Sequence, residues 1–350
     1  MQPRTDLAME AKALYERSAQ EQTQLSGVAA REQERHGVRM TVVKITNAEG
    51  EQALGKPRGT YITAELEALS RREPGSFSNA VRTVSRALRE LLGPCRQALV
   101  VGLGNRDITP DAIGPEAVKN LIVTRHLQAG PDEALPGLMR VAACQPGVLG
   151  QTGIESLELV KCAMQTAQPD VVIVIDALAA AEPGRLFRTV QLSDSGIVPG
   201  SGVGNSRQEF SRRTLGVPVI AVGVPTVVDA ISLFRQAELE LDVPRGVLVT
   251  MQDVATRVRE MAGSSATAAI WRCTGDCRWV KFRLFCHKRS NYRYVNCIMS
   301  PPEQIAANRR VLITMWKCGK AIGVQKFFTL STELSTPVFY ELFLTNFGSQ

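Results

Sequence analysis

The amino-acid sequence predicts an α/β fold in which helices cover both faces of a largely parallel sheet. Apolar runs at Leu99–Leu103, Val171–Asp176 and Val217–Gly223 are typical of buried strands. They alternate with segments of helical periodicity, and two glycine-rich loops, at 146–153 and 199–205, separate some of these elements. Strands that alternate with helices favour parallel pairing, because each helix crosses from one strand to the next.

The first part of the chain is expected to add strands and one long helix. Weak alternation predicts a strand at 38–45, and the residues Asn47 to Gly50 after it favour a turn. A second turn is predicted at Gly55–Gly59 and a second strand at 60–66. Apolar residues at helical spacing predict a helix at 77–92, which Gly93-Pro94 ends.

The middle of the chain continues the alternation. Thr109 is the expected N-cap of a helix and Pro110 its first residue, which places Asp111 in the first turn. The remaining expected elements are strands at 138–144 and 246–250, a strand at the sheet edge at 185–192, and helices at 154–167, 226–240 and 252–261.

The composition changes sharply near residue 270. From Trp271 to the end there are 12 Lys or Arg and 4 Asp or Glu, whereas 29 basic and 30 acidic residues precede it. This tail also holds all three Trp, 13 of the 19 aromatic residues and five of the eight Cys. We therefore expect 7–270 to form the main domain and 271–350 to lie outside the working fold. The alternative is a small added domain, which at this size would need metal or disulfide support.

The composition also limits the classes of partner. The net charge of +7 arises in the tail, so the main domain gives no reason to expect nucleic acid. No apolar stretch reaches the ~18 residues of a membrane span. The N-terminus lacks the apolar region of a secretory signal. A cytoplasmic protein without a membrane partner is expected.

Asp111 and Asp176 are the candidate catalytic residues. They lie beyond or at the ends of two predicted strands, where open α/β sheets place their sites. A helix N-terminus favours a carboxylate, so Asp111 is expected to ionise easily, whereas desolvation is expected to raise the pKa of Asp176. Such a pair suits general acid and general base catalysis on a peptide bond, although the sequence does not say which residue is the acid. Helix capping and turn formation are the alternative interpretations.

Other motifs give weaker signals. Gly102 and Gly104 begin a dinucleotide fingerprint, but Asp107 stands where the third glycine belongs. The loop at 199–205 lacks the Gly-Lys-Ser/Thr ending of a phosphate loop, and neither Ser195 nor Ser201 has a histidine nearby in sequence. A zinc site in the tail is the remaining option, although the spacing of its ligands is poor. Its residues would be Cys273, Cys277, Cys286 and His287.

Five segments within residues 4–262 resemble the germination proteases of bacterial endospores, which are aspartic-type endopeptidases. In order, they are VVGLGNRDITPDAIGP, PGVLGQTGIE, DVVIVIDALAA, QLSDSGIVPGSGVGN and LGVPVIAVGVPTVVDA. The resemblance implies a three-layer α/β/α sandwich, similar to that of hydrogenase-maturation proteases. It also implies that the aspartates of TPDAIGP and IDALAA, here Asp111 and Asp176, are catalytic without a metal or cofactor.

The resemblance further implies a role in the forespore and spore core. Proteins of this family hydrolyse small acid-soluble spore proteins, which coat DNA in the dormant spore, during germination. They are made as zymogens that remove their own N-terminus, and their active form is a homotetramer.

The N-terminal segment RTDLAMEA resembles the family's processing site, where cleavage follows the aspartate. This places the cut between Asp6 and Leu7 and makes residues 1–6 a pro-segment, which is short for the family. An acidic residue, an apolar residue and Ala also resemble the cleavage sites in the substrates. One cleft would then accept both.

The chain departs from the family pattern in two places. Residues Asp242 to Gly246 replace a longer polar insert, and the resemblance ends after the helix at 252–269. Two other functions stay open. One is a regulatory relative that kept the fold as a binding module and lost activity; the other is a nickel-dependent maturation protease, for which the sequence offers no suitable third ligand.

Overall fold

The structure is a computed structural model that describes residues 5–18, 25–128, 139–204, 207–236 and 246–273, and the backbone of four later strands. The chain divides into two compact units, Met1–Asp276 and Cys277–Gln350. The strands of the first unit are β1 Val28–Arg35, β2 Val38–Ile45, β3 Gly59–Glu65, β4 Gln97–Gly102, β5 Arg140–Cys144, β6 Val171–Ala180, β7 Thr189–Ser193, β8 Val219–Asp229 and β9 Leu248–Val249.

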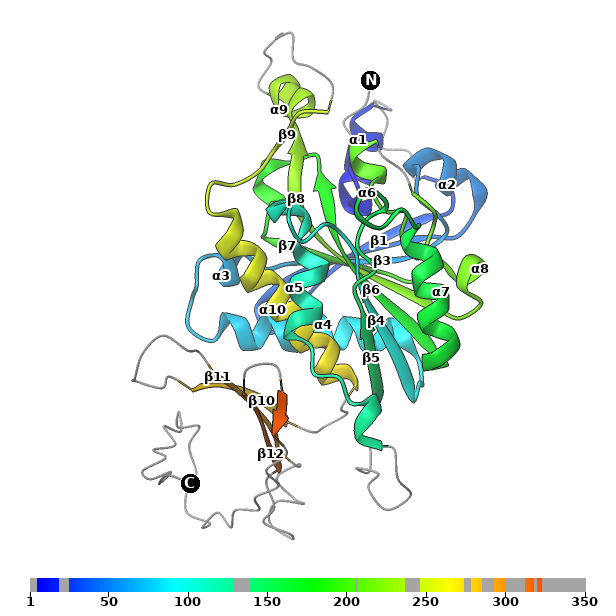
Figure 1. The fold of residues 1–350 in the computed structure, drawn as a ribbon. Coiled ribbons are helices and arrows are strands. Elements are labelled where there is room, and N and C mark those ends of the chain that lie inside the picture. Colours follow the sequence, from blue (N-terminus) through cyan, green and yellow to red (C-terminus); the bar gives the residue numbers. More distant parts are fainter. Residues whose placement is uncertain are drawn as a thin grey trace. The chain divides into compact units, whose positions relative to one another are not determined.

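Helices of very different length connect these strands (Figure 1). The α-helices are α1 Ala8–Ser18, α2 Ala48–Leu54, α3 Glu67–Ser70, α4 Ser76–Leu92, α5 Ile113–Asn120, α6 Leu149–Thr152, α7 Ser156–Ala167, α8 Arg212–Leu215, α9 Ala230–Gln236 and α10 Val254–Cys273. The 3₁₀ turns are η1 Thr109–Asp111, η2 Arg125–Gln128, η3 Pro183–Arg185 and η4 Ser201–Val203.

The strands of the first unit form one mixed sheet, in the order β1-β2-β3-β7-β8-β6-β4-β5, with β9 beside β8. Strands β8, β6, β4 and β5 pair in parallel. Strands β1, β2, β3, β7 and β8 pair antiparallel. The parallel half carries the helical crossovers, as the sequence predicts, whereas the other half is more antiparallel than the alternation of elements suggests.

Helices cover both faces of this sheet, which confirms the three-layer α/β/α prediction (Figure 1). On one face, α4, α5 and α10 pack through Leu88, Ile113 and Met261 on the strands. On the other face, α7 packs through Val160 and its neighbours on β4 and β6. The N-terminal helix α1 and α2 extend this second layer over β2 and β3. Both faces of the central strands are therefore buried, which explains why β6 and β8 read as continuous apolar runs.

Several predicted elements are correct to within a few residues. They are the strands at 38–45, 60–66, 99–103, 138–144 and 246–250 and the helices at 77–92 and 154–167. Strand β1 was not predicted, because it is polar and largely exposed. It joins β2 through His36 and Gly37, both with positive φ, which form the tight turn of a hairpin.

Four local predictions are wrong. The predicted turn at Asn47 begins α2, because the Asn47 side chain accepts a hydrogen bond from the Gly50 N–H at 2.9 Å. Thr109 is not an N-cap, since 109–111 form η1 and α5 begins at Ile113. Strand β7 lies inside the sheet, between β3 and β8, and not at its edge. Residues 226–229 continue β8, so only α9 remains of the helix predicted at 226–240, whose last four residues lie outside the described ones.

The second unit contains strands β10 Arg278–Leu284, β11 Arg293–Met299, β12 Leu312–Lys317 and β13 Lys320–Ile322, which pair antiparallel in this order. Helix α10 continues past the boundary predicted at 270 and ends at Cys273. Three ligands of the zinc hypothesis, Cys277, Cys286 and His287, lie outside the described residues. No helix among the described residues is long and apolar enough to span a membrane.

Candidate active site

Asp176 lies in the middle of β6, between the parallel strands β4 and β8. Its side chain is only 4% exposed, and its carboxylate accepts a hydrogen bond from the N–H of Ala177 at 2.9 Å. Burial raises the pKa of Asp176 well above its ordinary value, and the nearby charges of Asp111 and Asp6 raise it further. The site therefore favours the protonated form of the Asp176 carboxyl over the ionised form.

Asp111 closes η1, the turn that connects β4 to α5 above the strand ends. The N–H of Asn105 donates to its carboxylate at 2.6 Å. The structure thus brings together the two predicted catalytic aspartates, since the charge of Asp111 acts directly on Asp176.

The expected easy ionisation of Asp111 is wrong. Burial raises the pKa of this carboxyl, and the hydrogen bond from Asn105 only partly offsets the effect. The reason is structural: Asp111 ends a 3₁₀ turn before α5 and is not in the first turn of an α-helix. Both carboxyls of the pair therefore favour the protonated form, Asp176 more strongly than Asp111.

Asp6 lies beside the C-terminal end of β6, where hydrogen bonds to Ala179 hold both its backbone and its carboxylate. Its backbone N–H donates to the carbonyl of Ala179 at 2.9 Å, and the N–H of Ala179 donates back to the Asp6 carboxylate at 2.9 Å. Ser201 donates its hydroxyl to the other carboxylate oxygen at 2.8 Å. A Cβ on Gly202 would lie 2.1 Å from this carboxylate, so only glycine allows the η4 loop to approach so closely. The loop and the end of β6 together form a cradle for one carboxylate.

One side chain holds the two peptide groups on either side of Leu7. Gln191 of β7 donates its Nε2 to the carbonyl of Asp6 at 2.9 Å, and its Oε1 accepts the N–H of Ala8 at 2.8 Å. Leu7 is fully buried in the main core, as is Ala8 in the smaller cluster under α1. The predicted processing site is therefore an ordered part of the folded unit.

A lysine and a glutamate hold the neighbouring residues. Lys56 donates its Nζ to the carbonyl of Thr5 at 2.9 Å, and burial lowers the pKa of this amine against the opposing charges of Asp6 and Glu10. The buried Glu10 accepts backbone N–H groups of Ala181 and Glu182 just beyond β6.

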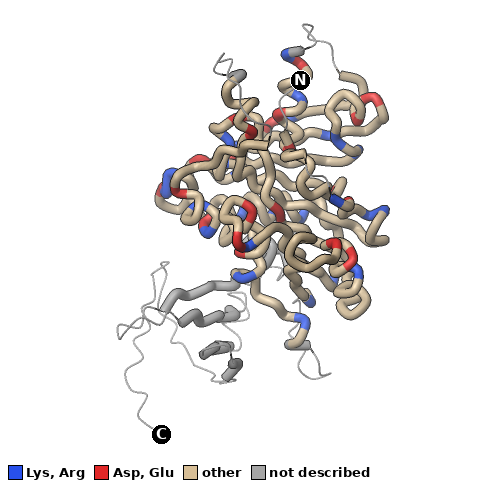
Figure 2. Tube along the Cα trace, turned by 45° about the horizontal axis from the view of Figure 1, so that its top comes forward, with Lys and Arg blue, Asp and Glu red and all other residues tan. Residues whose placement is uncertain are grey.

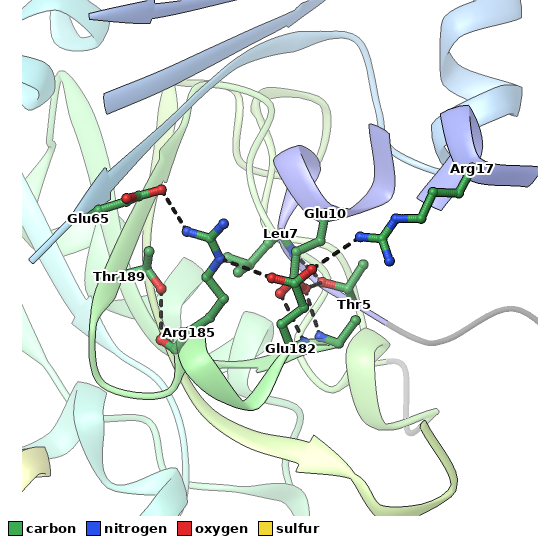
Figure 3. A network of polar contacts seen from close by, with 9 residues as sticks. Thr5, Leu7, Glu10, Arg17, Glu65, Glu182, Arg185 and Thr189 are labelled. Carbon is green, nitrogen blue, oxygen red and sulfur yellow. Dashed lines mark hydrogen bonds and ion pairs between the residues drawn. The ribbon is translucent and has the colours of Figure 1, made fainter. Parts of the chain in front are cut away.

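Figure 3 shows Glu10 and the ion pairs around it, in which the Arg185 guanidinium lies between Glu65 and Glu182. The Arg185–Glu65 pair is 2.7 Å long and mostly buried. Arg17 of α1 reaches Glu182 from the other side at 3.2 Å. Glu10 near the start of α1 and Arg17 in its last turn therefore both hold this helix against the segment that follows β6.

A cavity of about 450 Å³ lies beside the N-terminal segment that contains Thr5 and Asp6. Thr5 and Asp6 line it together with Lys56, Gln191 and Ser201. Asp111 and Asp176 do not line it. Register explains the separation: Asp176, Gly223 and Gln191 lie in one row across β6, β8 and β7. The Leu178 side chain fills the space over Gly223, where an added Cβ would meet it at 2.3 Å.

The other candidates from the sequence do not converge on this site. Ser195 donates its hydroxyl to Tyr61 at 2.9 Å, in a hydrogen-bond network with Ser193. Among the described residues, no group of three His, Cys, Asp or Glu side chains is placed to hold a metal ion. Ser201 belongs to the site as a hydrogen-bond donor to Asp6 and not as a nucleophile.

Sequence reasoning missed Gln191, Lys56 and Ala179, and it considered Ser201 only as a nucleophile and not as a hydrogen-bond donor to Asp6. Gln191 could have been found from the sequence, because it is a polar residue between apolar residues of a strand. Such an amide is buried in the structure, and a buried amide needs polar partners. Ala179 could not have been found in this way, because it contributes only backbone groups, which every residue has. In Figure 2, basic and acidic residues are interspersed around the first unit.

A buried carboxyl pair in the central sheet, with residues 5–8 of the same chain held nearby, defines a three-layer α/β/α protein with a candidate site at the carboxyl ends of its parallel strands. The family model of the germination protease matches residues 6–239, and the chain belongs to this family. The match begins at Asp6 and includes both catalytic candidates.

Individual relatives have the same name. The germination protease of Caldanaerobacter subterraneus subsp. tengcongensis is 46% identical over 233 residues, which is 66% of this chain and 70% of the relative. That of Bacillus cereus strain G9842 is 45% identical over 236 residues, 66% of this chain and 64% of the relative. The chain thus spans less than two thirds of the length of the Bacillus relative.

A solved structure, the [NiFe] hydrogenase maturation protease HycI from Thermococcus kodakarensis KOD1, is similar over 52% of this chain and 97% of its own. The TM-score is 0.31 and the identity 14%. The fold class stated above rests on the sheet order and the helical layers of this chain, not on that likeness.

Proposed function

We propose that this chain is an aspartic-type endopeptidase that is made as a zymogen and cuts its own chain between Asp6 and Leu7. The observation that carries the proposal is the ordered Asp6–Leu7 bond, held by Gln191 and Ala179 near two coupled, buried carboxyls. In this proposal residues 1–6 are the pro-segment and residues 7–270 the catalytic domain.

The pair would work by general acid and general base catalysis. Asp176, with the pKa raised more strongly, keeps its proton, and Asp111 acts as the base in its ionised form. Asp111 takes a proton from a water molecule whose oxygen attacks the Asp6 carbonyl carbon. Asp176 then protonates the Leu7 nitrogen, the C–N bond breaks, and the products are a carboxylic acid at Asp6 and an amine at Leu7.

The same arrangement supports a zymogen. Leu178 fills the space over Gly223, in the row between Asp176 and Gln191, so the bond and the acid are separated in the uncut chain. Cleavage therefore requires that Leu178 gives way. A buried leucine that must move first accounts for a chain that stays intact until conditions change.

The cradle for the Asp6 carboxylate supports substrates that are cut after an acidic residue. We propose small acid-soluble spore proteins as these substrates, in the forespore and spore core, and a homotetramer as the active form. Neither a cofactor nor a metal has a part in the proposed reaction.

The test is incubation of the purified full chain at mildly acidic pH, followed by intact-mass measurement and N-terminal sequencing. We expect loss of Met1 to Asp6 and a new N-terminus at Leu7. The processed chain is then given a small acid-soluble spore protein, and light scattering reports its assembly state. A stable full-length chain, or a cut elsewhere, would refute self-processing at this bond.

A further inference from the structure

We infer that Gln191 is a catalytic residue of self-processing, which polarises the Asp6 carbonyl and holds the bond in place for attack. The inference rests on the proposed function, because it assigns a role at the bond that the function says is cut. It starts from an observation that the aspartate pair does not explain: one buried amide side chain contacts the carbonyl of the Asp6–Leu7 bond and the N–H of the next peptide group, at Ala8.

The orientation of the Gln191 amide is determined by its partners. A backbone N–H can only donate, so the oxygen Oε1 must face Ala8, at 2.8 Å. This leaves Nε2 to face the Asp6 carbonyl, which can only accept, at 2.9 Å. A flipped amide would lose both hydrogen bonds, and Gln191 is 7% exposed, so water would replace them poorly.

The position of Gln191 relative to the acid pair is set by the sheet. Gln191 pairs with Gly223, and Gly223 with Asp176, so two strand spacings separate Gln191 from Asp176, roughly 10 Å between backbones. Gly223 has no side chain to fill the row between them. Gln191 therefore contacts the Asp6 carbonyl from β7, whereas Leu178, which fills the space over Gly223, separates the carboxyls on β6 and η1 from the bond until it moves.

This geometry is that of an oxyanion donor. When water adds to the Asp6 carbonyl carbon, the C=O π electrons move to oxygen, and the negative charge develops at the atom that Nε2 already contacts. A fixed donor in a buried site stabilises that charge more than it stabilises the neutral carbonyl. The second hydrogen bond, from Ala8, keeps the amide from turning away as the carbon becomes tetrahedral. Loss of one such donor typically slows catalysis about 10²–10³-fold.

The first test compares self-processing rates of Gln191→Met and Gln191→Glu with the unsubstituted chain over a range of pH. Gln191→Met removes the donor and should be about 10²–10³-fold slower at every pH. Gln191→Glu should be as slow near neutral pH, and its rate relative to the unsubstituted chain should recover in acid, where a protonated carboxyl donates again. A role in folding alone would not produce this recovery. Equal rates for all three chains would overturn the inference.

A matched control is available at the far edge of the sheet. Gln145 follows β5 and also donates its Nε2 to a backbone carbonyl, that of Pro115, at 3.0 Å. Gln145→Met and Gln145→Glu should process at the unsubstituted rate. If they are slowed as much as the Gln191 variants, loss of any such glutamine matters and the specific role is refuted.

The second test does not depend on cleavage. Asp6-Leu7 is the only Asp-Leu pair in the sequence, so a chain with ¹³C-carbonyl Asp and ¹⁵N Leu gives a single Asp-Leu carbonyl–amide signal. In a chain that carries Asp176→Asn to keep the bond intact, Gln191→Met should move the Asp6 carbonyl shift upfield. An unchanged shift would refute the contact, whereas an unsubstituted chain that never cuts would refute self-processing and with it a catalytic role of Gln191.

Discussion

Two carboxyls that share one buried site impose a cost on the folded state whenever both are ionised. Asp176 has no cation among the groups that shift its pKa; desolvation and two negative neighbours all favour its protonated form. A purely structural residue at this position would be apolar, as the other β6 residues before it are. Retention of a buried acid at the centre of the sheet is typical of a functional site.

The cost of ionising the buried Asp176 predicts how the free energy of unfolding depends on pH. The folded-state pKa of Asp176 lies above the unfolded value of about 3.9, so the folded chain binds the proton more tightly. The stabilisation that this tighter proton binding gives the folded state is fully present below about pH 4, and it is lost as the pH rises through the folded-state pKa of Asp176. We expect Asp176→Asn, which carries no charge, to become increasingly more stable than the unsubstituted chain from pH 4 upward.

Urea unfolding of both chains at several pH values measures this difference. Asp194→Asn is a suitable control, since Asp194 is an exposed carboxylate that accepts the N–H of Thr60. A stability difference between Asp176→Asn and the unsubstituted chain that does not change with pH would contradict a buried, protonated Asp176.

Substitution of either aspartate of the pair is expected to reduce the self-processing activity. Asp111→Asn and Asp176→Asn should each slow self-processing about 10²–10⁴-fold, because an amide can serve neither as the base nor as the acid. Circular dichroism should show an unchanged fold. Near-normal appearance of the Leu7 N-terminus in either variant would remove that residue from the mechanism.

At the scale of elements, the close approach of α5 to the sheet sets the position of Asp111. A Cβ on Gly114 would lie 2.2 Å from the carbonyl oxygen of Leu103 and 2.5 Å from that of Ile175. Ile175 immediately precedes Asp176, and η1 with Asp111 leads directly into α5. Gly114 therefore helps set the spacing between the two aspartates.

Gly114→Ala should push α5 outward, because backbone atoms block the added methyl group. We expect a loss of about 1–3 kcal/mol in the free energy of unfolding and slower self-processing. Gly263→Ala in α10 is the control, since its Cβ would meet no atom within 4 Å and should stabilise the helix by about 0.5–1 kcal/mol. Thermal unfolding and processing rates measure both, and a stable, fully active Gly114→Ala chain would contradict this account.

The elements also show how far the sequence alone reaches. Central strands and long amphipathic helices were predictable because burial on one or both faces leaves a periodic pattern, as in α4 and β6. The polar hairpin strand β1 and the extension of β8 to Asp229 leave no such pattern. At the site, Asp111, Asp176 and Asp6 were identified from motifs, but the grip of Gln191 depends on strand order, which pairs β7 with β8 only in the folded sheet.

At the scale of the whole molecule, the first unit contains every residue of the proposed site. Its sheet, its three cores and the family match to residue 239 all lie before Cys277. Helix α10 belongs to this unit, because Val258 and Met261 pack in its main core. The change in composition near residue 270 therefore falls within the last turns of α10, close to the boundary between the units.

This arrangement predicts that the tail is dispensable. Truncation after Ala269, where the composition changes, would remove the last turn of α10, so we place the cut after Asp276, the end of the first unit. The shortened chain should fold, release Met1 to Asp6 and keep its activity. Removal of 12 aromatic residues should also reduce aggregation, because exposed aromatic surface favours association. Unfolding midpoint, processing rate and light scattering compare the two chains, and a shortened chain that fails to fold or assemble would show that the tail belongs to the working structure.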